Sequence, residues 1–337
     1  MAHVTFIHGI GNKVEAGLLE RAWVDSLRDS GGPDLWSEHV TTSMCYWADV
    51  LYATPVPATA GSTEAGEEAE VMAAEDIGQT WYEELPAAEK EEVRELAAEV
   101  GAITWLTDLD ETVEVGRGAD WVTGAEDHAM AGPEVSGPAA PVEVADEFER
   151  VPLPGPLKKR LMRAFLRDVH HYLWDVDYSP RPGDTFRVRR DVRRRALDAL
   201  AAAERAPRPH VVVGHSLGSV IAYDVLKNVD GAPVCDGLVT LGSPLGLDEV
   251  QDRLDPGWSR WDGFPAGTLG GSWVNVFDRL DPVCGFDPVL ANDFRREGQS
   301  VVTDVDEPNW GTWRHSIGKY FRGPRLRKTL VDLLGIA

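Results

Sequence analysis

The feature that most constrains the fold is a run of three valines, Val211–Val213, that leads directly into Gly214–Gly218. A short run of β-branched residues favours a buried strand, and the residues after Gly218 have helical spacing. A strand that passes into a helix at a single serine, Ser216, must turn within a few residues. Glycine two positions before and after the serine gives this turn space, because glycine has no Cβ. The segment predicts a strand–serine–helix unit in an α/β domain.

This unit has the pattern of a nucleophile elbow, G-x-S-x-G between a strand and a helix. Such a turn lifts the serine Oγ out of the sheet, and the helix N-terminus behind it favours negative charge. A serine hydroxyl is a weak nucleophile at neutral pH. It needs a base, commonly a histidine that a carboxylate orients. The rest of the chain is expected to supply both partners.

The expected base is His315. In elbows of this type the chain order is serine, then acid, then histidine. Only one of the nine histidines follows Ser216 in the sequence, and it lies in an expected loop after the last predicted strand. The other histidines are interpreted as structural, and the side chain of His215 is expected to point away from the nucleophile.

The acid is expected between Ser216 and His315, directly after a strand. Asp281 meets this expectation best, because it follows a predicted strand over 273–278 and precedes Pro282, which restricts the loop. Asp278, three residues earlier, and Asp287 are the alternatives.

A developing oxyanion needs two backbone N–H donors. Leu217 follows the serine and is expected to supply one. Ile10 is expected to supply the other, from the run His8-Gly9-Ile10-Gly11 after a predicted strand over 3–8. The alternative interpretation of this run is an ordinary tight turn.

Strands and helices are expected to alternate along most of the chain, which predicts a doubly wound, mostly parallel sheet of about six strands with helices on both faces. The core of this α/β domain is expected to comprise residues 1–53 and 151–337. The other expected strands are 39–47, 210–215, 237–242 and 300–305, and the expected helices are 15–29, 157–176, 191–205, 217–228 and 324–334.

Residues 54–150 interrupt this alternation as an acidic insertion, with helices expected over 68–84 and 87–106 and a loop over 116–146. Residues 61–150 contain 25 acidic and 4 basic side chains, which account for most of the chain's net charge of −23. Two interpretations stay open: a lid or cap over the active site, or a solvated acidic surface. The insertion also offers a docking surface for a protein partner.

The strongly acidic composition argues against nucleic acid or an anionic membrane as a partner. We expect no membrane span, since no run of about 18 apolar residues occurs. The N-terminus has no signal-peptide pattern, which favours a cytoplasmic protein. The three cysteines have neither metal nor disulfide spacing, and we expect them to be reduced and buried, with no metal and no cofactor; they are Cys45, Cys235 and Cys284.

An arginine cluster, at 187, 189, 190 and 193–195, has two interpretations. One is phosphate binding. The other is a solvated helix face that opposes the acidic insertion.

Together, the His8-Gly9-Ile10-Gly11 run, the Gly214–Gly218 elbow, Asp281-Pro282-Val283 and His315 resemble the α/β-hydrolase superfamily. The run from Gly214 to Asp224 and the Leu241–Leu245 turn are similar to its lipase and esterase branches, including phospholipase-like and inositol-deacylase-like proteins. The resemblance covers residues 1–52 and about 155–335. The chain begins at what would be the family's third strand, and the metal-binding signature of the phospholipase branch is missing.

The resemblance implies a serine hydrolase that cleaves an acyl ester of a small or lipid-like molecule. Ser216, His315 and Asp281 would form the triad of an acyl-enzyme mechanism, and Ile10 and Leu217 would hold the oxyanion. Two alternatives remain at this stage. The same triad serves peptidases, thioesterases and acyltransferases, and a fold of this kind also occurs in non-catalytic binding modules.

Overall fold

The computed structural model describes residues 1–57, 81–99, 155–254, 259–284, 287–311 and 313–336. Its centre is a six-stranded sheet in which every neighbouring pair is parallel, in the order β10-β7-β6-β5-β1-β2. The strands are β1 (His3–Ile7), β2 (Thr41–Cys45), β5 (His210–His215), β6 (Cys235–Leu241), β7 (Leu269–Phe277) and β10 (Val302–Asp306). The predicted six-stranded, mostly parallel α/β sheet is confirmed.

The strand order reverses direction between β1 and β5. From β1 the chain first adds β2 on one side, and the later strands of this sheet are added on the other side, beginning with β5. In open parallel sheets, ligands bind beyond the carboxyl ends of the strands at such a switch point. The segments that follow these two strands begin at His8 and Ser216, so both predicted loops lie at the switch point of the sheet.

Two hydrophobic cores lie on opposite faces of the sheet, because successive side chains of a strand point to opposite faces. In β5, Val211 and Val213 belong to one core and Val212 belongs to the other. This explains why β5 is a continuous apolar run: both of its faces are covered by helices.

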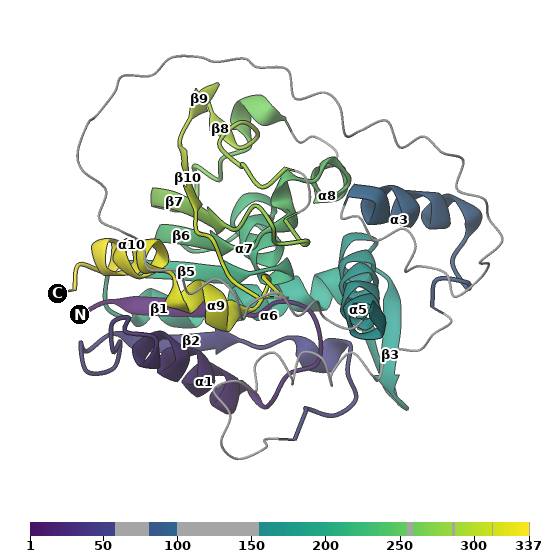
Figure 1. The fold of residues 1–337 in the computed structure, drawn as a ribbon, viewed down its shortest axis with the longest axis horizontal. Helices are drawn as coiled ribbons and strands as arrows, with labels where there is room; N and C mark the ends of the chain where they lie inside the picture. The colour runs from purple at the N-terminus through teal and green to yellow at the C-terminus, as the bar shows by residue number, and fades with distance from the viewer. Residues whose placement is uncertain (58–80, 100–154, 255–258, 285–286, 312, 337) are drawn as a thin grey trace.

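Helices cover both faces (Figure 1). One core includes residues of α1 (Ala16–Asp29), α9 (Ile317–Arg322) and α10 (Pro324–Leu334). The other core includes residues of α3 (Ala87–Glu99), α5 (Gly155–Leu173), α6 (Val188–Ala202), α7 (Leu217–Asn228) and α8 (Asp248–Leu254). The predicted helix boundaries agree within about three residues for α1, α5, α6, α7 and α10.

Part of the acidic insertion packs into the core. The side chains of Val93, Leu96 and Ala97 in α3 are fully buried in the same hydrophobic core as α5 and α7, and α3 lies beside α5 and α8 in Figure 1. Of the helix expected over 68–84, residues 81–84 form a turn and the rest lies outside the described residues. The expected helix over 87–106 is present from Ala87 to Glu99, and its remaining residues and the expected loop over 116–146 lie outside the described residues.

The structure contains a β-hairpin that the sequence patterns did not predict. β3 (Asp177–Arg181) pairs antiparallel with β4 (Asp184–Arg187). Two prolines in a short polar run argue against a strand, yet here they lie in an exposed two-stranded ribbon where a missing N–H costs little. A second short hairpin, β8 (Arg295–Arg296) with β9 (Gln299–Ser300), has too few residues to give a periodic signal.

The three cysteines are free and buried, as expected. No helix in the described ranges has the length and apolar character needed to cross a membrane.

Candidate active site

Ser216 occupies a strained turn between β5 and α7. Its backbone has φ 55° and ψ −130°, a conformation that costs a non-glycine residue about 1–3 kcal/mol and often marks a functional site. The flanking glycines are required by space. A Cβ on Gly214 would lie 2.7 Å from the Gly218 carbonyl oxygen, and one on Gly218 would lie 2.2 Å from the Ile7 carbonyl oxygen. The predicted tight turn is therefore present.

The loop after β1 packs directly against this turn. A Cβ on Gly9 would lie 2.7 Å from the Cβ of Ser216, so only glycine fits here. His8 fixes the loop to the end of β2: its ring stacks on Trp47 at 4.8 Å, and its Nε2 accepts a hydrogen bond of 3.1 Å from the Trp47 N–H.

Asp168 of α5 supports the far side of the same loop. Its Oδ2 accepts hydrogen bonds from the Gly11 N–H at 2.8 Å and from the Tyr52 hydroxyl at 2.9 Å, while its Oδ1 is paired with Arg167 at 2.7 Å. Arg167 and Asp168 are both buried. Ile10 therefore lies between two anchored positions, and Leu217 is the first residue of α7, where an N–H has no partner inside the helix.

The structure brings the side chains of His315 and Asp281 together. Nδ1 of His315 lies 2.8 Å from Oδ2 and 3.0 Å from Oδ1 of Asp281. Asp281 follows β7 and His315 precedes α9, so two loops 34 residues apart in sequence supply the pair. Both side chains are buried. Gly242 makes room for them, because a Cβ there would lie 2.8 Å from Asp281 Oδ2.

Asp281 is held as a carboxylate. Burial alone would raise its pKa, but His315 and the hydrogen bonds that Asp281 accepts from Tyr320 and Val283 outweigh burial and lower the pKa below its ordinary value. The Tyr320 hydroxyl donates to Oδ2 at 2.7 Å and the Val283 N–H donates to Oδ1 at 2.9 Å. Burial and Asp281 raise the pKa of Tyr320 well above its ordinary value, so its hydroxyl remains a donor.

The two alternative acids have other contacts. Asp278 accepts hydrogen bonds from the backbone N–H groups of Leu280 and Asn309, both at 2.8 Å, and pairs with Arg314 at 3.1 Å. It organises the loops on both sides of the pair. Asp287 is half-buried, and burial raises its pKa. Among the described residues, the carboxylate that contacts the ring of His315 belongs to Asp281.

Two polar atoms of the three predicted catalytic side chains have no hydrogen bond among the described residues. Ser216 Oγ and His315 Nε2 are both buried, and neither has a partner among the described residues. A buried polar group without a partner costs about 1–3 kcal/mol, so each such atom calls for an explanation. Nε2 is the nitrogen left available when Nδ1 of the same ring faces a carboxylate. Its lone pair and the serine hydroxyl are the two groups that a proton transfer requires.

His215 contacts His315, an interaction that the sequence interpretation did not include. Its ring stacks on His315 at 4.6 Å between centroids, and its Nε2 donates a 2.8 Å hydrogen bond to the His315 carbonyl oxygen. Burial and the neighbouring His315 lower the pKa of His215 well below its ordinary value, so it is a neutral ring. No sequence pattern indicated this role, because the contact joins residues 100 positions apart.

In the ester cleavage that we propose below as the function, we expect His215→Ala to lower kcat about tenfold with little change in KM, because the His315 ring loses its stacking partner and its backbone anchor. His215→Gln retains an N–H donor of similar reach and should recover part of the loss. Steady-state kinetics on the three proteins checks this. Equal kcat values for wild type and His215→Ala would show that His215 does not position His315.

Buried neutral histidines should make the fold sensitive to acid. Burial lowers the pKa of His8 to about 3, whereas an unfolded histidine titrates near 6.5. Between these values the unfolded chain binds the extra proton. The free energy of unfolding should therefore fall by up to about 1.4 kcal/mol per pH unit as pH drops from 6.5 towards 3.

Urea unfolding at pH 7.5, 6.5, 5.5 and 4.5 measures this dependence. His171, His210 and His215 also have lowered pKa values and add to the slope of the wild type. His8→Gln should reduce the slope while leaving those contributions in place. A wild-type stability that is constant between pH 7.5 and 5.5 would contradict the neutral assignment.

Three described tryptophans have different surroundings. Trp273 is buried against Tyr223 and Phe294, and Trp261 is exposed. Trp313 contacts the His315 ring edge-on at 5.7 Å. Within the described ranges, no group of three or more His, Cys, Asp and Glu residues has an arrangement that would hold a metal ion.

Comparisons with protein-family models, with curated proteins and with solved structures find no match to this chain.

Proposed function

We propose that the protein is a serine hydrolase that cleaves acyl esters. The single observation that carries the proposal is the buried Asp281–His315 pair, whose Nε2 lacks a hydrogen bond, in a site that also holds the strained, unpartnered Ser216. The position of Ser216 beyond β5, at the switch point of the sheet, supports it independently.

In the proposed mechanism, the Ser216 Oγ attacks the acyl carbonyl while His315 Nε2 takes its proton. Asp281 holds the Nδ1–H tautomer and stabilises the imidazolium that forms, without itself becoming protonated. His315 then gives the proton to the leaving alcohol, and an acyl-Ser216 intermediate remains. Water, deprotonated by the same nitrogen, releases the acid and restores the serine.

The oxyanion of each tetrahedral intermediate needs two fixed donors. We assign these to the backbone N–H groups of Leu217 and Ile10. Leu217 is at the positive end of α7, where negative charge is favoured. Ile10 is held in a loop that His8 and Asp168 anchor from opposite sides. A donor fixed before the reaction needs no reorganisation during it.

A substrate panel tests the reaction class. p-Nitrophenyl esters of increasing acyl length, a matched acyl thioester and a peptide p-nitroanilide should be offered to the full chain at pH 7.5. We expect ester turnover above that of the thioester and the anilide. Cleavage confined to the peptide substrate would overturn the esterase assignment but keep the triad, and no turnover of any substrate would contradict both.

A further inference from the structure

Asp168 of α5 is a fully buried carboxylate that is not part of the proposed triad. Its Oδ2 accepts the Gly11 N–H at 2.8 Å and the Tyr52 hydroxyl at 2.9 Å, and its Oδ1 accepts Nε and Nη2 of Arg167 at 3.0 and 2.7 Å. The side chains of Arg167 and Asp168 are exposed by only 4% and 0%. The Arg167 guanidinium also lies over the Tyr52 ring, 4.8 Å from its centroid. One aspartate thus joins α5 to the loop after β1.

Stability alone does not account for this buried pair. Taking two opposite charges out of water costs free energy that their attraction often only offsets, so a buried ion pair is weak evidence for stability. What the pair adds is a charged acceptor for the Gly11 N–H, and hydrogen bonds to charged acceptors are shorter and stronger than those to neutral ones. The donor lies 157 positions away in the sequence, in the loop that carries Ile10. The pair therefore fixes one particular peptide group of that loop.

Gly11 gives this loop conformational freedom that Asp168 removes. The Gly11 φ of 82° lies in the left-handed region, which glycine adopts as readily as negative φ values. The peptide group between Ile10 and Gly11 can therefore take more than one orientation in an isolated loop. Asp168 accepts the N–H of that group and selects one orientation. The preceding peptide group carries the Ile10 N–H, the assigned oxyanion donor, so the direction of this N–H depends on the same contact.

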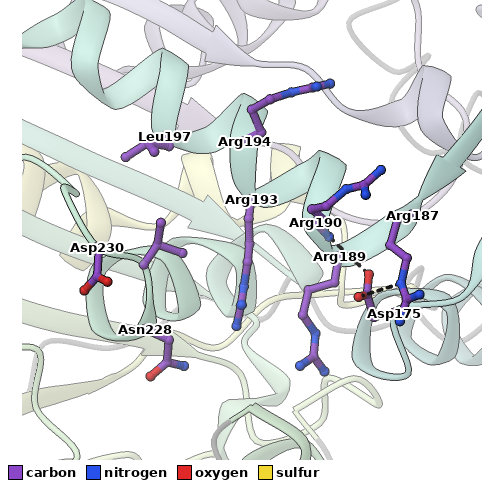
Figure 2. Close-up of a pocket in the computed structure, with 10 residues that line it drawn as sticks. Asp175, Arg187, Arg189, Arg190, Arg193, Arg194, Leu197, Asn228 and Asp230 are labelled. Carbon is purple, nitrogen blue, oxygen red and sulfur yellow. Dashed lines mark hydrogen bonds and ion pairs between the residues drawn. The ribbon is translucent and has the colours of Figure 1, made fainter.

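A similar arrangement occurs a second time, away from the oxyanion loop. Asp224 of α7 is also fully buried, and it accepts the Tyr172 hydroxyl at 2.6 Å and Nε and Nη2 of Arg193 at 2.8 and 2.6 Å. Arg193 extends from α6 and lines a cleft of about 620 Å³ (Figure 2). Another donor to Asp224 is the Asn228 side chain of the same helix, at 2.8 Å. Asp224 thus joins three helices, whereas Asp168 joins a helix to the oxyanion loop.

The other arginines of the cluster between 187 and 195 have different partners. Arg187 pairs with Asp175 at 3.0 Å, as a dashed line in Figure 2 marks. Arg190 and Arg194 share Asp191, at 3.4 and 3.1 Å. These carboxylates come from the α/β core. In the described part of the chain, no arginine of the cluster pairs with the acidic insertion, contrary to the expected opposition of these two segments.

We propose that Asp168 is a positioning residue for the oxyanion site. Through the Gly11 N–H it holds the loop so that the Ile10 N–H faces the oxyanion that forms on the substrate at Ser216. Arg167 balances the charge of Asp168, so the anchor adds no net negative charge beside a site that stabilises one. The inference rests on the proposed hydrolase function and adds to it a residue that acts through the loop rather than on the substrate.

Steady-state kinetics on Asp168→Ala, with Asp224→Ala as the matched control, tests the proposal. Both variants leave an arginine and a tyrosine without their carboxylate, so both should unfold at a lower temperature than the wild type. Asp168→Ala should lower kcat for ester cleavage by about 30-fold with KM within about twofold, because a misplaced oxyanion donor weakens the transition state more than substrate binding. Asp224→Ala should keep kcat within about threefold of the wild type.

Asp168→Asn provides a milder variant at the same position. It keeps an acceptor oxygen for the Gly11 N–H but loses the charge, and it should lower kcat by about fivefold, since a neutral acceptor holds the loop less firmly. This variant decides the question if Asp168→Ala does not fold. Asp168→Asn with the kcat of the wild type would then overturn the proposal.

A tetrahedral inhibitor separates positioning from a general loss of structure. A trifluoromethyl ketone with the acyl chain of the best ester adds to Ser216 and forms an oxyanion. Its inhibition constant should rise in Asp168→Ala by the same factor by which kcat/KM falls. The pH dependence of kcat/KM should stay that of the wild type, because the triad is unchanged.

Equal kcat values for Asp168→Ala and Asp224→Ala would overturn the proposal. An unchanged inhibition constant or a shifted pH dependence in Asp168→Ala would also overturn it, because the residue would then act elsewhere than on the oxyanion. Ester turnover by the wild type that Ser216→Ala abolishes separates failure of this inference from failure of the hydrolase assignment. No turnover by the wild type would refute both.

Discussion

Ser216→Ala is expected to lower kcat for ester cleavage by at least about 10⁴-fold, because it removes the nucleophile of the proposed mechanism. Activity on the best p-nitrophenyl ester, measured beside thermal unfolding, checks this. The unfolding temperature should stay close to that of the wild type, because alanine keeps the same strained backbone.

Ser216→Gly provides a second variant with a different signature. It should lose activity to the same extent, yet gain about 1 kcal/mol of stability, because glycine adopts φ 55° without strain. Turnover in both variants within tenfold of the wild type would place the nucleophile elsewhere in the chain.

Asp281→Asn is expected to lower kcat by about 10⁴-fold with little change in KM. An amide can donate to Nδ1 of His315, and the ring then carries its proton on Nε2, where it cannot accept one from Ser216. The change is close in size and leaves the hydrogen bond from Val283 with an acceptor. Steady-state kinetics at pH 7.5 measures the effect.

The matched control for this variant is Asp287→Asn, a half-buried aspartate further along the same connection to β10. It should retain kcat within about threefold, since surface-side substitutions of this kind have small effects. If Asp287→Asn were the inactive protein and Asp281→Asn the active one, the assignment of the acid would be wrong.

The parts of the fold that depend on local pattern were predictable. The three valines before Gly214 predicted β5, because a short run of β-branched residues favours a buried strand. The glycines around Ser216 predicted the turn, because it has no space for a Cβ at those positions. The chain order left one histidine, His315, as the candidate base. The loop that Pro282 restricts favoured one aspartate, Asp281, as the acid. The structure brings these two side chains to 2.8 Å.

The rest of the site depends on tertiary contacts that leave no local pattern. Tyr320 reaches Asp281 from α9, and His215 reaches His315 across 100 residues of chain. Neither residue type nor spacing indicates such a partner. The support of Gly11 by Asp168 is of the same kind, and it needs a buried ion pair that no sequence period reveals.

The proposed nucleophile is tested most directly by locating the covalent adduct of a fluorophosphonate probe with peptide mass spectrometry. We predict one modified residue, Ser216, in the folded wild type, with labelling slowed at least 100-fold in His315→Ala because the base is missing. Unlabelled wild-type protein, or an adduct on another residue that persists in Ser216→Ala, would contradict it.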